Sequence, residues 1–260
     1  MIMRTQIGLL LALLATAPAV AAAGYVAIPG GAFVSALALD GAAARIVIKP
    51  FAMRVEPVTN AEYLDYVRTH PDWQRGQVSP LFAGPQYLAA WQGPLTLGPD
   101  ALPEQPVTSV SWFAARAYCA GEQARLPSWY EWEFVAAADA TRRDARRDPL
   151  RNQALLTAIQ GSTGERPGVI GRHRANVWGV RDLNRLLWEW TGDYAAMFPN
   201  ADARVAGAGP SLALCGGSAL AFADKNQFAL MMRVAALTAL KPADDAPRVG
   251  FRCVRDPAGE

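Results

Sequence analysis

The chain has 260 residues, of which 52% are hydrophobic and 18% charged, and its formal net charge is +2. A soluble domain averages about 25% charged residues, so the composition is apolar but not that of a membrane protein. The near-neutral charge argues against nucleic acid or an anionic membrane surface as the main partner.

The N-terminal residues 1–23 have the features of a secretory signal peptide. Arg4 is their single charge, residues 7–17 are apolar, and Ala21-Ala22-Ala23 offers a small-residue cleavage pattern. The apolar run is shorter than the ~20 residues of a spanning helix, although an uncleaved anchor is the alternative. We therefore expect an exported, periplasmic protein that is not an integral membrane protein, with a single domain over residues 24–260.

The next elements are two short strands and a helix. Residues 25–33 form a strand pattern broken by Gly30-Gly31, and residues 45–51 alternate like a second strand. Thr59 with Glu62 forms a capping box that begins a helix ending near Arg68. The Pro- and Gly-rich residues 71–106 predict a long ordered loop. Its expected aromatic anchors are Trp73, Phe82, Tyr87 and Trp91.

Two further helices are predicted in the middle of the chain. Ser111 begins one over residues 112–122, and Ser128 with Glu131 begins another over residues 129–138. The mixed-charge run 142–148 predicts a solvated helical face, with a docking patch for an acidic partner as the alternative. From Gly161 onward, short apolar runs between Gly and Pro predict strands and loops without another long helix.

The three cysteines are Cys119, Cys215 and Cys253. In an oxidising compartment one pair can form a disulfide and one thiol is left over. We predict a bridge between Cys119, in a helical segment, and Cys253, near the C-terminus. The sequence has no CxxC motif, which argues against a zinc knuckle or a thioredoxin-type site.

Four segments form an ordered set of motifs. They are Val110-Ser111-Trp112 with Ala117-Tyr118-Cys119; Arg125-Leu126-Pro127 with Glu131-Trp132-Glu133; residues 176–183 with Trp188-Glu189-Trp190-Thr191; and Gly216-Gly217-Ser218, Arg233 and Gly250-Phe251-Arg252-Cys253. In this order and spacing they resemble the formylglycine-generating enzyme family, also called sulfatase-modifying factors. The resemblance implies an α+β fold, the irregular, loop-rich variant of the C-type-lectin-like fold.

Charged residues of these motifs lie among apolar neighbours. Arginines and carboxylates are rarely buried unless they are paired. We therefore expect a buried ion-pair lattice that fixes irregular loops. Its members would be Arg125, Glu131, Glu133, Arg233 and Arg252.

The family resemblance implies a pair of copper-binding cysteines shortly after the Gly-Gly-Ser segment. Ala221 and Asn226 stand near those positions in this chain. Because neither side chain can bind copper(I) as a thiolate does, we expect formylglycine formation to be lost. Cys215 with Met231 or Met232 offers an alternative soft copper site, although a lone cysteine among leucines is more often a small buried hydrophobe. Copper is therefore not expected.

Calcium is the one cofactor that the resemblance favours. The family's calcium loop would take side-chain oxygens from Asp182 and Glu189 and backbone carbonyls from Arg185 and Leu187. Oxygen ligands of this kind suit a hard cation. The alternative is an ion pair of Arg185 with Asp182 or Glu189. The family's second calcium loop has no counterpart in residues 139–175.

The sequence favours a non-catalytic binding or accessory factor whose partner is a periplasmic protein or the ectodomain of a membrane protein. Exported, cysteine-poor members of the family resemble a regulator of type VI secretion that acts through a membrane kinase, or accessory proteins of copper nitrite reductase and copper delivery. The rival is a periplasmic oxidoreductase similar to the pyoverdine-maturation member, with a carboxylate such as Asp224 as acid or base. The two histidines, His70 and His173, exclude a three-histidine metal centre within the chain and leave a facial triad formally open.

Overall fold

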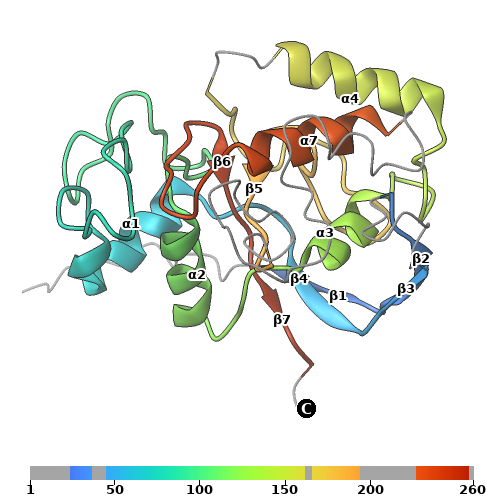
Figure 1. Cartoon of the computed structure of the whole chain (residues 1–260), viewed down its shortest axis with the longest axis horizontal. Helices are drawn as coiled ribbons and strands as arrows, with labels where there is room; N and C mark the ends of the chain where they lie inside the picture. Colours follow the sequence, from blue (N-terminus) through green and yellow to red (C-terminus); the bar gives the residue numbers. More distant parts are fainter. Residues whose placement is uncertain (1–23, 37–44, 162–165, 194–226, 258–260) are drawn as a thin grey trace, which may run out of the picture.

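A computed structural model describes residues 24–36, 45–161, 166–193 and 227–257. Helices and short strands alternate with long irregular segments (Figure 1). The elements are β1 (Tyr25–Ile28), β2 (Gly31–Val34), β3 (Arg45–Ile48), β4 (Phe51–Arg54), α1 (Asn60–Thr69), the 3₁₀ turn η1 (Pro71–Trp73), α2 (Trp112–Gly121), α3 (Trp129–Ala136), α4 (Pro149–Gly161), β5 (Trp188–Glu189), α7 (Phe228–Thr238), β6 (Val249–Gly250) and β7 (Val254–Arg255).

Three small sheets form within the described residues. β4 lies between β1 and β7 in an antiparallel sheet, β2 pairs antiparallel with β3, and β5 pairs parallel with β6. The predicted strand over residues 45–51 is two strands that separate at Lys49-Pro50, because proline lacks the N–H that a sheet ladder needs. β2 and β3 therefore form a hairpin of their own, at the end of the molecule opposite α1 (Figure 1).

The three predicted helix starts are confirmed. Thr59 and Ser128 each accept a hydrogen bond from the backbone N–H of a glutamate three residues on, and that glutamate reaches back to the cap N–H. Ser111 caps α2 by accepting from the Ala114 N–H. These capping contacts are local in sequence, which is why the residues alone locate α1, α2 and α3.

The main hydrophobic core lies between α1, α2, α3, α7 and the long loop. Tyr63, Trp129, Trp190 and Phe251 are at most 1% exposed in it. The loop over residues 71–106 is held to this core as expected, with the Trp91 indole donating to Asn60 Oδ1 at 3.0 Å. Phe82 is an exception among the predicted anchors, because 45% of it is exposed.

Two expectations for the second half of the chain are wrong. Residues 142–148 are irregular rather than helical, and their Arg146 is buried. The second concerns the residues from Gly161 onward, where no further long helix was expected but α7 begins at Phe228; α4, which begins at Pro149, precedes that stretch. The two lie side by side along one edge of the molecule (Figure 1). No helix in the described part of the chain is long and apolar enough to cross a bilayer.

Candidate functional site

A cavity of about 760 Å³ lies between the β2 hairpin, the end of α3 and the irregular residues after α3. One wall is the continuous stretch from Gly30 to Ala36, which includes β2. Phe134 of α3, Ala137 directly after α3 and Trp178 complete the apolar lining, and Gln227 adds an amide group. Polar groups come mainly from the charged run, with Arg143, Asp144, Arg146 and Arg147. Cavities of this volume and mixed lining are typical of ligand sites.

Aromatic rings form the floor of the cavity. Phe134 and Trp178 stack with their centroids 5.4 Å apart, and Phe33 meets Phe134 edge-on at 5.6 Å. The guanidinium of Arg143 lies 5.1 Å from the Trp178 ring centroid, and that of Arg146 lies 5.8 Å from Phe33. The aromatic faces thus hold two arginines at the cavity wall by cation–π attraction.

A buried carboxylate lies behind this wall. Glu133 of α3 accepts hydrogen bonds from Ser35 Oγ at 2.5 Å, the Ala36 N–H at 2.6 Å, Trp129 Nε1 at 3.0 Å and Arg146 at 3.0 Å. Burial raises the pKa of Glu133 despite these donors and the Arg146 charge. Since both oxygens are already engaged, Glu133 fixes the wall and is not free to serve as a base.

The arginines of the charged run fall into two groups. Arg146 pairs with Asp144 and Glu133, and Arg142 pairs with Asp139 and Asp148. Arg143 and Arg147 are exposed and have no carboxylate partner among the residues that the structure describes. Within the described ranges the cavity therefore has two positive charges that no carboxylate pairs with, and such charges favour an anionic ligand.

A second set of charges is buried in the core, where the predicted lattice is found in part. Arg252 donates to both oxygens of Glu189, at distances from 2.8 to 3.1 Å, and the Trp132 indole donates to the same carboxylate at 2.8 Å. Arg125 pairs with Glu131, but its side chain is 39% exposed. Arg233 differs from the prediction, because it stacks 3.7 Å above Trp132 and donates to a backbone carbonyl. Burial lowers its pKa to about 9.

The predicted calcium ligands are not assembled as free oxygen donors. Glu189 is occupied by Arg252 and Trp132, while Asp182 accepts from the Gly171 N–H and from His173 Nδ1, both at 2.6 Å. N–H groups thus satisfy both carboxylates. In the described chain neither of them forms the ion pair with Arg185 that was the alternative to calcium. Calcium binding stays a prediction, which the contacts of this loop do not favour.

The loop in question bends at residues that tolerate a left-handed backbone. Asp182 and Asn184 have φ values of 64° and 62°. Asp and Asn adopt this conformation more readily than other non-glycine residues. These two residues therefore allow the chain to turn directly before Arg185-Leu186.

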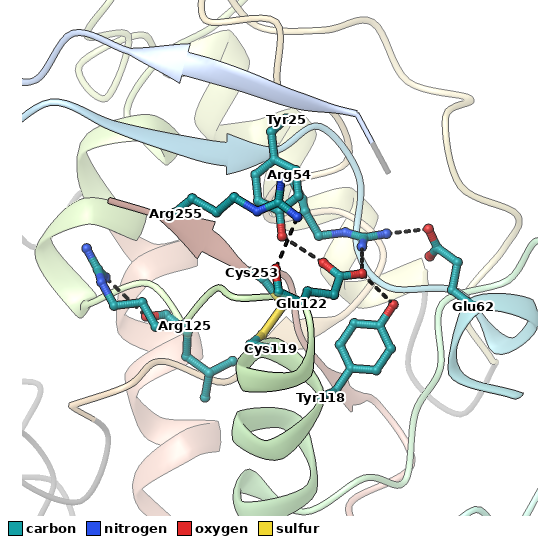
Figure 2. Close-up of a disulfide and its surroundings, with 10 residues drawn as sticks. Tyr25, Arg54, Glu62, Tyr118, Cys119, Glu122, Arg125, Cys253 and Arg255 are labelled. Atoms are coloured by element: carbon teal, nitrogen blue, oxygen red, sulfur yellow. Dashed lines mark hydrogen bonds and ion pairs between the residues drawn. A yellow bond between two sulfur atoms is a disulfide. The ribbon is translucent and has the colours of Figure 1, made fainter. Parts of the chain in front are cut away.

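The disulfide joins Cys119 of α2 to Cys253, the same two cysteines that the sequence analysis paired. A polar network surrounds it in Figure 2, where Glu122 accepts from Tyr25 at 2.8 Å, Tyr118 at 2.9 Å and Arg54 at 2.7 Å. Both cysteines are 0% exposed. The bridge is therefore a structural link between α2 and the C-terminal strand.

Several predicted positions lie outside the described residues. These are Cys215, Ala221, Asp224 and Asn226. Met231 packs against the main core, whereas its neighbour Met232 is 38% exposed. The two alternative methionine ligands thus differ in exposure, and Cys215, which either would need, lies outside the described residues. In the described ranges no three His, Cys, Asp or Glu side chains gather in a way that could hold a metal.

Sequence reasoning missed the cavity itself, although it weighed a docking role for residues 142–148. The run of arginines was the available signal, but the sequence does not show which of them are paired. It also does not show that Trp178 and the β2 hairpin lie beside that run. Phe134 and Trp178 are 44 positions apart in the sequence, and Phe33 and Arg146 are 113 positions apart.

Comparisons with known proteins agree with the motifs. A family described as the sulfatase-modifying factor enzyme 1-like domain matches residues 11–257. The formylglycine-generating enzyme of Streptomyces coelicolor is 28% identical over 90% of this chain and 89% of its own length. The inactive C-alpha-formylglycine-generating enzyme 2 of Mus musculus is 28% identical over 58% of this chain and 61% of its own length.

Two further similarities come from a curated enzyme and a solved structure. Hercynine oxygenase of Mycolicibacterium smegmatis is 29% identical over 67% of this chain, but this chain spans only 46% of that enzyme. PvdO from Pseudomonas aeruginosa has a TM-score of 0.51 at 18% identity, covering 90% of this chain and 94% of PvdO. That likeness concerns the fold alone. The predicted family and its loop-rich α+β fold are confirmed.

Proposed function

The chain belongs to the sulfatase-modifying factor enzyme 1-like family, and we propose that it is a member without paired-cysteine oxidase chemistry that serves as a binding or accessory factor. The cysteine count carries this proposal. The chain has three cysteines and the buried disulfide uses two of them, so Cys215 alone remains. One thiol cannot supply the pair of thiolates that the family's copper(I) chemistry requires.

The cavity beside β2 is the recognition site of this proposal. It combines an aromatic floor with two arginines that lack a carboxylate partner in the described chain. Binding sites commonly pair a large apolar lining with a few polar groups that orient the ligand. Uncompensated arginines also favour acidic partners over basic ones, which gives the site specificity.

The proposed setting is the periplasm, with residues 1–23 as the export signal. The partner would be a periplasmic protein or the ectodomain of a membrane protein, and nucleic acid is not expected. One specific role of this class is regulation of type VI secretion through a membrane kinase. Assistance to copper nitrite reductase or to copper delivery is another. Reporter fusions to residues 1–23 test export, since a cytoplasmic reporter would contradict this setting.

The loss of oxidase chemistry is tested with purified protein, copper(I), oxygen and a cysteine-containing sulfatase peptide. We expect the peptide to keep its cysteine in mass spectra, while the Streptomyces coelicolor enzyme converts it under the same conditions. Formylglycine in the first reaction would overturn the proposal.

The binding role requires a stoichiometric partner that is cross-linked in the periplasm and rebinds when both proteins are purified.

The rival function is an oxidoreductase, which the oxygenase among the relatives keeps open. Its proposed acid or base, Asp224, lies outside the described residues, and Glu133 beside the cavity has both oxygens engaged. Turnover of a small oxidisable substrate without any protein partner would favour the enzyme.

Calcium is tested separately by metal analysis, and a melting temperature unchanged by a chelator would argue against it.

A further inference from the structure

We infer that the cavity receives an extended acidic segment of a partner protein, which adds as a strand to the open edge of β2. This inference rests on the proposed binding function and names the chemistry of its partner. Acidic side chains of the segment would pair with Arg143 and Arg147. Its alternate apolar side chains would lie on the rings of Phe134 and Trp178.

The first argument is the course of the cavity along β2. Among the described residues β3 is the hydrogen-bonded neighbour of β2, and no described strand pairs with the opposite edge of β2. The cavity is lined by consecutive residues from Gly30 to Ala36. Successive residues of a strand point to opposite faces, so a cavity lined by all of them runs along the edge of the strand. An open edge offers backbone N–H and C=O groups to an incoming extended chain.

The second argument is the charge that faces this edge. Four arginines lie within residues 142–147, and the described structure pairs Arg142 and Arg146 with carboxylates. Arg143 and Arg147 have no such partner there and both line the cavity. Because the described carboxylates nearby already pair with other arginines, a carboxylate from outside would meet two guanidinium groups that have no ion pair in the described chain.

The third argument is the alternation of the two kinds of surface. Arg143 lies over Trp178, and Trp178 stacks on Phe134, so charge and apolar surface are adjacent at one wall. A bound strand presents side chains alternately to its two sides. A segment that contains both acidic and apolar residues would therefore bring carboxylates to the arginines and apolar side chains to the adjacent rings.

The direct test uses a fluorescein-labelled decapeptide of alternating Glu and Val, titrated by fluorescence anisotropy against the full chain. We expect saturable binding, weakened about tenfold by Arg143→Glu and about tenfold by Arg147→Glu. Arg116→Glu is the matched control, because Arg116 is exposed and lies 5.4 Å from the Trp112 ring but does not line the cavity. This control variant should leave the affinity unchanged. If the melting curve of a variant shows misfolding, the substitution of the same arginine by Gln replaces it.

Strand addition is tested with two N-methylated forms of the same peptide, each methylated at every second residue in opposite registers. One form should bind at least about tenfold more weakly and the other like the parent, because only one set of N–H groups faces β2. Equal binding of both forms would overturn strand addition. Competition by free glutamate or inorganic phosphate at the peptide's own concentration would also overturn the inference, in favour of a small-anion site. A periplasmic partner that still binds the Arg143→Glu, Arg147→Glu double variant would leave the proposed function intact and refute this inference alone.

Discussion

Arginines occupy two contrasting regions of this molecule, the core beneath β5 and the cavity beside β2. Arg252 in the core is 0% exposed and donates to Glu189 and to the backbone carbonyls of Arg54, Val55 and Arg181. At the cavity, Arg143 and Arg147 are exposed and lack a carboxylate partner in the described chain. Burying a charge is costly unless it is paired, whereas an exposed charge can remain available. The contrast separates arginines that hold loops together from arginines that are free to bind.

The largest effect is expected at the disulfide, which belongs to the core side of this contrast. Cys119 and Cys253 are 134 residues apart in sequence, and in the chain-entropy model closing such a loop stabilises the fold by about 5 kcal/mol. Replacing both with Ala should lower the free energy of unfolding by about this amount in urea titrations. Cys215→Ala is the control, and a similar loss in that variant would show that the bridge is not the cause.

The next effect is expected at Arg252. Arg252→Ala would leave the buried Glu189 carboxylate with the Trp132 indole as its remaining side-chain donor. Removing one partner of a buried ion pair costs about 3–5 kcal/mol, and we expect a loss in that range by urea unfolding. Arg68→Ala, which breaks an exposed ion pair with Asp65, should cost less than about 1 kcal/mol. Similar losses in the two variants would remove the distinction between core and surface arginines.

Arg146 lies between the two regions, because it lines the cavity and also pairs with the buried Glu133. Arg146→Ala leaves Glu133 three other donors, so we expect a smaller loss than at Arg252, about 2 kcal/mol. The free energy of unfolding that this variant loses in urea titrations should therefore lie between the losses of Arg252→Ala and Arg68→Ala. A loss as large as that of Arg252→Ala would show that Arg146 stabilises the fold as much as the core arginine does.

Acid stability provides a subtler comparison between Glu122, in the network around the disulfide, and Glu133. Burial alone would raise the pKa of Glu122, but Arg54 and the hydroxyls of Tyr25 and Tyr118 outweigh it and lower this pKa. Burial raises the pKa of Glu133. Glu122 thus contributes stability that is present above its unfolded pKa of about 4.3 and is lost as the pH falls. The contribution of Glu133 has the opposite sign, since it is present below the unfolded pKa and is lost as the pH rises through the raised pKa of the folded state.

The measurement is urea unfolding of Glu122→Gln and Glu133→Gln between about pH 3 and pH 7. The stability of wild type relative to Glu122→Gln should grow as the pH rises. The same difference for Glu133→Gln should shrink. Parallel slopes would show that the two carboxylates do not differ in their environments.

Local signals account for the parts of the fold that the sequence predicts. The capping residues Thr59, Ser111 and Ser128 bond to amides within three residues, and they locate three helices. A similar signal existed for α4, since Asp148, directly before Pro149, accepts hydrogen bonds from the N–H groups of Leu150 and Arg151 in the first turn. This signal lay beside a charged run that was interpreted as the helix itself.

The candidate site was less accessible to sequence reasoning because its contacts are long-range. Pairing of Arg146 with Glu133 depends on where α3 places the carboxylate, and the stacking of Trp178 on Phe134 depends on two segments that meet only in the fold. The disulfide was easier to predict, because three cysteines allow few pairings. The calcium ligands followed from the family motif, which does not show that Arg252 occupies Glu189.

The smallest expected change in stability is also the most informative. Arg147→Ala removes an exposed side chain that has no carboxylate partner in the described residues, and Arg143→Ala removes one stacking contact with Trp178. Surface substitutions of this kind stay within about 0.5 kcal/mol, with up to about 1 kcal/mol for an exposed cation–π contact. Urea unfolding should therefore barely distinguish these variants from wild type, although both should weaken binding of the acidic peptide. A loss of several kcal/mol would show that the two arginines stabilise the fold as Arg252 does, and the free charge of the cavity would then need a structural explanation.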